Sequence, residues 1–146
     1  MKSVIKVDEG FFVAPQIDVS AAEELRSHGI ATIINNRPDG EEAGQPTAGD
    51  AGRLFEQEGF EYHHLPVTMN SLSPEVVEEF YKVWEGATGP VVAHCRSGMR
   101  SILLWALAEA RYGAKPADVI LSKASNAGFD LSSAEGLLQQ IAAMPR

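Results

Sequence analysis

Cysteine is nearly absent from this chain, which has a single one, Cys95. One cysteine forms no internal disulfide, and this suits a reducing compartment, so we expect a cytoplasmic protein. No apolar run approaches the length of a membrane span, and the mixed segment after Lys2 does not resemble a secretory signal. His63 and His64 are adjacent and would point to opposite faces of a strand. We therefore predict no metal site, no cofactor and no membrane contact.

Positive charge is also scarce. The chain has 12 Lys and Arg against 20 Asp and Glu, a formal net charge of −8. This balance argues against general nucleic-acid binding. No repeat, linker or low-complexity tract divides the 146 residues, so we predict one domain over 1–146.

Two arginines, Arg96 and Arg100, nevertheless follow the cysteine closely. The segment 91–93 predicts a short buried strand, a turn follows at Ser97-Gly98, and the apolar run from Ile102 predicts a helix. Such a loop directs backbone N–H groups and a helix N-terminus at its mouth, so it binds anions and stabilises a thiolate. We predict Cys95 as the nucleophile and Arg100 as the guanidinium that holds the substrate.

The remaining loop residues are candidates for supporting roles. Ser101 can hydrogen-bond the sulfur, and contacts with the anionic substrate are predicted for Arg96, Ser97, Gly98 and Met99.

Residues 95–101, Cys-Arg-Ser-Gly-Met-Arg-Ser, resemble the active loop of rhodanese-type sulfurtransferases, Cys-Arg-x-Gly-x-Arg-Ser. With His94, the stretch is also similar to the His-Cys-(x)5-Arg loop of cysteine-dependent phosphatases. Four residues separate Cys95 from Arg100, one fewer than in that pattern. The shorter ring of backbone donors counts against efficient phosphate-ester chemistry.

A second polar loop, 35–42, follows the predicted strand 30–34. In an open α/β sheet ligands gather beyond the carboxyl ends of strands, so this loop belongs on the same rim as Cys95. Arg37 would then contact substrate, and Asp39 or Glu41 would supply a proton. A solvated loop with capping carboxylates is the alternative.

Strand and helix patterns alternate before the cysteine loop, and helical patterns follow it. This order predicts an α/β domain with a small, mostly parallel sheet covered by helices. The strands are expected at 4–7, 11–14, 30–34, 61–67 and 91–93, and helices at about 18–29, 47–58, from 74, 102–112, 115–124 and 131–143.

The order of elements resembles that of the dual-specificity phosphatases, whose loop before the corresponding helix carries an aspartate that protonates the leaving alcohol. Here this loop, residues 68–73, has no carboxylate. General acid catalysis typically contributes about 10²–10⁴ in rate, so its absence weakens the case for a phosphatase unless Asp39 or Glu41 substitutes.

Two motifs together, Asn-Arg-Pro-Asp-Gly-Glu at 36–41 and His-Cys-Arg-Ser-Gly-x-Arg-Ser at 94–101, closely resemble the phosphatase-like domain of the bacterial beta-lactamase hydrolase-like family. The resemblance runs from about Val13 to the C-terminal helices. It implies a fold similar to that of the dual-specificity phosphatases, and an activity described both as phosphatase-like and as sulfur-transferring.

The leading prediction is a sulfurtransferase. The Cys95 thiolate would accept a sulfane sulfur as a persulfide and pass it to a thiol acceptor or cyanide, with no need for a proton donor. The alternative is a phosphatase acting through a Cys95 phosphoenzyme, with Ser101 assisting the leaving thiolate and Asp39 or Glu41 as the acid. A third possibility is an anion-sensing or partner-binding module without turnover. For the two enzymes the partner is a small anionic substrate, with a thiol acceptor in the case of sulfur transfer.

Overall fold

The computed structural model describes residues 4–113 and 115–144. Lys2, on which the expectation of no secretory signal rests, lies outside these ranges. The strands form one sheet in the order β1-β2-β5-β3-β4, and β1 pairs antiparallel with β2 while the other pairs are parallel. The prediction of a mostly parallel sheet is therefore confirmed. The strands are β1 (Ile5–Asp8), β2 (Phe11–Ala14), β3 (Thr32–Asn35), β4 (Glu61–His64) and β5 (Val91–His94).

Helices begin directly after Thr47 and after Ser73, where each side chain caps the first turn. The Thr47 side chain accepts a hydrogen bond from the Asp50 amide, and Ser73 accepts one from the Val76 amide. The helical segments are η1 (Val19–Ala21), α1 (Ala22–Ser27), α2 (Ala48–Gln57), α3 (Pro74–Gly86), α4 (Met99–Tyr112), α5 (Ala117–Asn126), η2 (Ser132–Ala134) and α6 (Glu135–Ala142).

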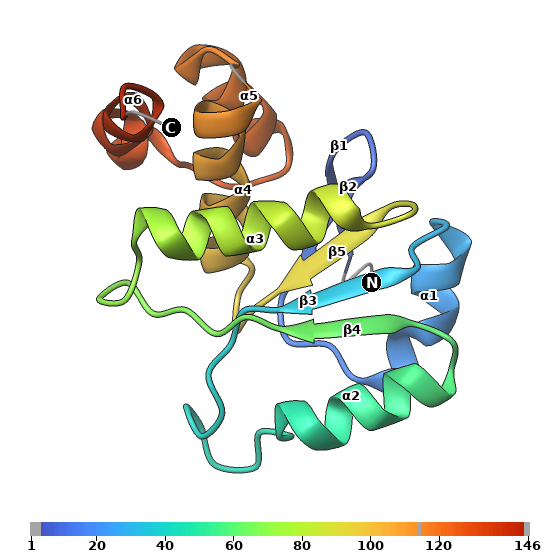
Figure 1. The fold of residues 1–146 in the computed structure, drawn as a ribbon. Coiled ribbons are helices and arrows are strands. Elements are labelled where there is room, and N and C mark those ends of the chain that lie inside the picture. The colour runs from blue at the N-terminus through green and yellow to red at the C-terminus, as the bar shows by residue number, and fades with distance from the viewer. Residues whose placement is uncertain (1–3, 114, 145–146) are drawn as a thin grey trace.

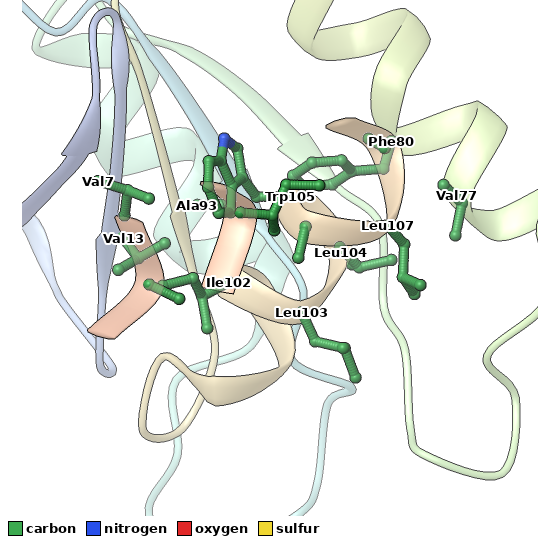
Figure 2. Packing of buried hydrophobic residues seen from close by; sticks show 14 of the residues in the cluster. Val7, Val13, Val77, Phe80, Ala93, Ile102, Leu103, Leu104, Trp105 and Leu107 are labelled. Atoms are coloured by element: carbon green, nitrogen blue, oxygen red, sulfur yellow. The ribbon is translucent and has the colours of Figure 1, made fainter. Parts of the chain in front are cut away.

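Helices cover both faces of the sheet (Figure 1). Helices α3 and α4 lie over one face and α1 and α2 over the other, while α5 and α6 pack around α4. Every residue of α4 from Ser101 to Ala110 is buried, so α4 is the central helix that its apolar sequence predicts. Figure 2 shows Trp105, Ile102 and Leu107 directed from α4 into this core, with Phe80 of α3 beside them.

Two sequence-based details are wrong. Strand β3 begins at Thr32 and not at Ile30, and β4 ends at His64, shortly before Pro66, which cannot donate a ladder hydrogen bond. The two adjacent apolar residues of α2 differ in burial, because Leu54 is 42% exposed while Phe55 is fully buried. The core-facing side of α2 carries Ala48, Ala51, Gly52 and Phe55, and Leu54 lies outside that stripe.

Candidate active site

The loop from Cys95 to Gly98 connects the central strand β5 to helix α4. Gly98, the residue before α4, has a φ of +98°, and a Cβ there would lie 3.1 Å from the Phe129 ring, so conformation and packing both favour glycine. In this turn the Gly98 N–H donates to Cys95 Sγ at 3.1 Å. A backbone amide at a helix N-terminus is thus directed at the sulfur, as the loop pattern predicts.

Arg100 lies on the first turn of α4, and its guanidinium faces a carboxylate. Its Nη1 and Nη2 donate to Glu41 Oε2 and Oε1 at 2.7 and 2.9 Å, and Nη1 also donates to the Val67 carbonyl at 2.9 Å. The hydrogen bonds to Glu41 raise the pKa of Arg100, and attraction to Cys95 adds to this effect. Arg100 is therefore close to Cys95, and both terminal nitrogens of its guanidinium are hydrogen-bonded to Glu41.

Glu41 is held by a second arginine as well. Arg37 Nε donates to Glu41 Oε1 at 2.9 Å. Hydrogen bonds from Arg100 lower the pKa of Glu41 to about 2, with Arg37 adding to the shift and partial burial opposing it. In this arrangement Glu41 is a carboxylate at neutral pH and has no proton to donate.

Arg37 has a different place from the one that we predicted. It is 2% exposed, and its guanidinium also donates to Gln16 Oε1 and Glu42 Oε1, each at 3.1 Å. This burial does not fit the predicted direct contact with substrate. Arg37 instead braces the loop that carries Glu41 and Glu42.

The structure supports the capping alternative for Asp39. Its Oδ1 accepts a hydrogen bond from the Ala48 amide at 2.8 Å, at the start of α2. The carboxylate that meets Arg100 is Glu41, so the predicted role of Asp39 as the acid lacks support from this geometry.

Ser101 is buried on α4, and its hydroxyl donates to Asn36 Oδ1 at 2.8 Å. Asn36 Nδ2 in turn donates to the Leu65 carbonyl at 3.0 Å. Because a hydroxyl has one proton, Ser101 does not donate to the sulfur in this arrangement, and its hydrogen bond to the sulfur during the reaction stays a prediction. Its hydroxyl links α4 to the loop after β3.

The other loop residues lie on the outside of the turn. The Arg96 side chain is 68% exposed, with Nη2 at 3.6 Å from Glu42 Oε2. The Met99 amide donates to Ser97 Oγ at 3.4 Å, and both residues are exposed. Contacts of Arg96, Ser97, Gly98 and Met99 with substrate stay a prediction.

The site gathers at the carboxyl ends of the parallel strands, and the loop after β3 shares this rim with Cys95, as predicted. Sequence reasoning missed three contributors, namely the Gln16 side chain after β2, the Asn36 side chain after β3 and the Val67 carbonyl after β4. Their positions in the sequence could have indicated them, because each lies within three residues of the carboxyl end of a strand on this rim.

His94 precedes Cys95 at the end of β5 and is 1% exposed. Burial lowers its pKa to about 4, and the nearby Arg37 and His64 act in the same direction. His94 is consequently neutral at pH 7.

Among residues 4–113 and 115–144, no three His, Cys, Asp or Glu side chains gather in a way that could hold a metal ion. Over the same ranges, no helix is both long and apolar enough to cross a bilayer.

Comparison with known proteins identifies the family. The family model for the phosphatase-like domain of beta-lactamase hydrolase-like proteins matches residues 4–112. The chain belongs to this family. A beta-lactamase hydrolase-like protein from Agrobacterium fabrum is 34% identical over an alignment of 146 residues. The alignment covers 99% of this chain and 34% of that protein. The chain thus spans about a third of the length of the curated family members that it matches.

Solved structures show the same fold. The crystal structure of a candidate phosphatase from Neisseria meningitidis Z2491 is 37% identical, has a TM-score of 0.86, and is matched over 97% of this chain and 99% of that chain. Pseudomonas aeruginosa TpbA, crystallised with phosphotyrosine, has a TM-score of 0.68 over 97% of this chain and 91% of that chain, at 13% identity. At 13% identity the likeness to TpbA shows the fold alone.

These findings confirm the predicted family and the predicted cysteine-phosphatase-like α/β fold. They show a phosphatase-like domain, and none of them shows transfer of sulfur.

Proposed function

We propose that this domain is a cysteine-dependent phosphatase, which hydrolyses a small phosphomonoester through a phosphorylated Cys95. The observation that carries the proposal is the hydrogen bond from the Gly98 amide to Cys95 Sγ at 3.1 Å, with Arg100 on the adjoining helical turn. Membership in a phosphatase-like family supports the same function. The proposal reverses the order of our two sequence-based hypotheses.

In the first step, the Cys95 sulfur attacks phosphorus and the P–O ester bond breaks, while the leaving oxygen takes up a proton. Water then attacks the phosphorus, the P–S bond breaks, and inorganic phosphate leaves. Amides at the N-terminus of α4 and the guanidinium of Arg100 are suited to binding the anionic oxygens in both steps. Phosphotyrosine is the first substrate to test, because the similarly folded TpbA was crystallised with it.

Sulfur transfer is the second candidate, and two observations favour it. Only four residues separate Cys95 from Arg100, one fewer than in the phosphatase pattern, and this shorter ring counts against efficient phosphate-ester chemistry. The carboxylate beside Arg100 is ionised, since the pKa of Glu41 is lowered to about 2. Transfer of a sulfane sulfur from a donor such as thiosulfate to a thiol needs no proton donor for an anionic leaving group.

One experiment compares the candidates directly. Rates are measured with phosphotyrosine and with thiosulfate plus cyanide, for the wild type and for Cys95→Ser. Phosphate release that is lost in Cys95→Ser, with a phosphoryl group trapped on Cys95 in a rapidly quenched sample, is the expected result. A mass gain of one sulfur atom on Cys95 after thiosulfate treatment, without phosphate release from phosphotyrosine, would instead establish the sulfurtransferase.

A further inference from the structure

The guanidinium of Arg100 already holds an anion that belongs to the protein itself. Glu41 binds it through two parallel hydrogen bonds of 2.7 and 2.9 Å, which is how an arginine holds a phosphoryl group. Glu41 lies 59 positions away in the sequence, on the loop after β3. Its carboxylate therefore occupies the donors that the proposed function requires for substrate.

The nucleophile is closed off in the same arrangement. Cys95 is 0% exposed, so a phosphoryl group cannot approach the sulfur unless a neighbouring group moves. The main chain around Glu41 is held, because its amide donates to Gln45 Oε1 at 3.1 Å and Gln45 Nε2 donates to the Pro38 carbonyl at 2.9 Å. The Glu41 side chain, 26% exposed at the rim, can move with the least disturbance.

We propose that the substrate's phosphoryl group displaces Glu41 from Arg100, and that the displaced Glu41 then protonates the leaving oxygen. This inference rests on the proposed phosphatase function. Arg37 Nε, at 2.9 Å from Glu41 Oε1, keeps the displaced side chain beside the mouth of the loop.

Displacement changes the protonation of Glu41 in the direction that catalysis needs. The two hydrogen bonds from Arg100 are the main cause of its low pKa, and substrate removes them. The incoming phosphoryl group adds a negative neighbour, which also favours the protonated form. Asp39 and Glu42, the other carboxylates of this loop, keep their contacts with the Ala48 amide and with the guanidinium groups of Arg37 and Arg96.

The proton balance is complete. Glu41 takes a proton from solvent when it leaves Arg100, and it gives this proton to the ester oxygen as the S–P bond forms and the P–O bond breaks. In the second step the Glu41 carboxylate takes a proton from the attacking water while the P–S bond breaks and the Cys95 thiolate is restored.

The first test measures displacement without turnover. Inorganic phosphate is titrated by calorimetry into Cys95→Ser and into Cys95→Ser combined with Glu41→Gln. Removing the competing carboxylate should tighten phosphate binding about tenfold, as expected for the loss of a partly exposed ion pair. Glu42→Gln in the same background is the matched control and should leave the affinity nearly unchanged, because Glu42 pairs with Arg37 and Arg96 and not with Arg100. Unchanged or weaker binding with Glu41→Gln would overturn the displacement.

The second test measures proton donation. The kcat of Glu41→Gln is compared with wild type on 4-nitrophenyl phosphate, whose leaving group needs no proton, and on phenyl phosphate, whose leaving group does. We expect kcat to fall by about 10²-fold or more on phenyl phosphate and far less on 4-nitrophenyl phosphate. Equal losses on both esters would overturn the acid role. A wild type inactive on both esters, with phosphate binding still tightened, would overturn the proposed function and the acid role but uphold the displacement.

Discussion

Arg37 and Arg96 both pair with Glu42, but one side chain is buried and the other is exposed. Arg37 is 2% exposed and bonds Gln16, Glu41 and Glu42, whereas the Arg96 side chain is 68% exposed and approaches Glu42 alone. A buried guanidinium depends on its partners, while an exposed ion pair contributes little. Burial therefore indicates a structural role for Arg37, whereas the exposed side chain of Arg96 is accessible to molecules in solution.

Arg37→Met should lower the free energy of unfolding by about 2–3 kcal/mol, because it removes several charge-assisted hydrogen bonds from the base of the loop. Arg96→Met is the control and should change it by less than about 1 kcal/mol. Urea denaturation of both variants checks this. Equal effects would mean that Arg37 does not brace the loop.

His94 predicts a pH dependence of stability. Its pKa in the folded chain is about 4, below the ordinary value of 6.5, because burial disfavours the charged ring. Between these values the unfolded chain binds a proton that the folded chain does not, so acidification favours unfolding. The contribution of His94 to stability is complete above pH 6.5 and is lost progressively as the pH falls to about 4.

Urea denaturation at several pH values measures this effect. The loss of stability between pH 6.5 and 4 should be smaller in His94→Leu than in wild type. The reason is that unfolding of the wild type takes up about one proton at His94 in this range, and the variant has no such group. An identical slope in the two proteins would show that His94 is protonated to the same extent in the folded and unfolded chains.

At the scale of elements, the junction between β5 and α4 sets the geometry around Cys95. Gly98 ends the loop in a left-handed conformation, with a φ of +98°, and its amide bonds Cys95 Sγ. A side chain at this position is strained and would also meet the Phe129 ring and the Ala14 carbonyl.

Gly98→Ala should lower stability by about 1–3 kcal/mol and abolish most of the activity, because the amide that bonds the sulfur is displaced. Gly136→Ala is the matched control, since Gly136 lies in α6 and a Cβ added there would meet open space. It should raise stability by about 0.5–1 kcal/mol and leave the activity intact. Thermal unfolding and steady-state kinetics of the two variants check this, and equal losses in both would contradict the role of Gly98.

At the scale of the whole molecule, the two ends of the chain are joined by charged side chains. Lys123 Nζ of α5 donates to Asp8 Oδ1 of β1 at 2.7 Å, across 115 positions of sequence. Lys115 bonds Glu109 of α4 and lies 3.8 Å from Asp8 Oδ2. The edge hairpin is thereby attached to the helical part that covers the sheet.

Asp8→Asn should lower the free energy of unfolding by about 1–2 kcal/mol, since it weakens a partly buried pair that links distant segments. Glu9→Gln affects only the exposed Lys6–Glu9 pair and should be neutral within about 0.5 kcal/mol. Hydrogen exchange of the β1 amides that becomes faster in Asp8→Asn but not in Glu9→Gln would support the proposed attachment of β1 through Asp8. Equal exchange in both variants would contradict it.

Local signals predicted most of the fold, and long-range partners escaped prediction. The caps at Thr47 and Ser73 and the loop around Cys95 are readable because the interacting groups lie a few residues apart. The Arg100–Glu41 and Ser101–Asn36 contacts span 59 and 65 positions, and they depend on β3 lying beside β5. No local sequence pattern predicts this strand order. For that reason the sequence predicted a hydrogen bond from Ser101 to the sulfur and a contact of Arg37 with substrate, and did not predict their partners in the structure.

The complete burial of Cys95 has a consequence for oxidative chemistry. Peroxide and alkylating reagents need access to a thiol, and the buried sulfur offers them none in this structure. The substrate-free protein should therefore lose little activity to iodoacetamide over times that inactivate open cysteine enzymes. Burial that makes the proposed substrate wait for a rearrangement would in the same way protect the sulfur on which the proposed catalysis depends.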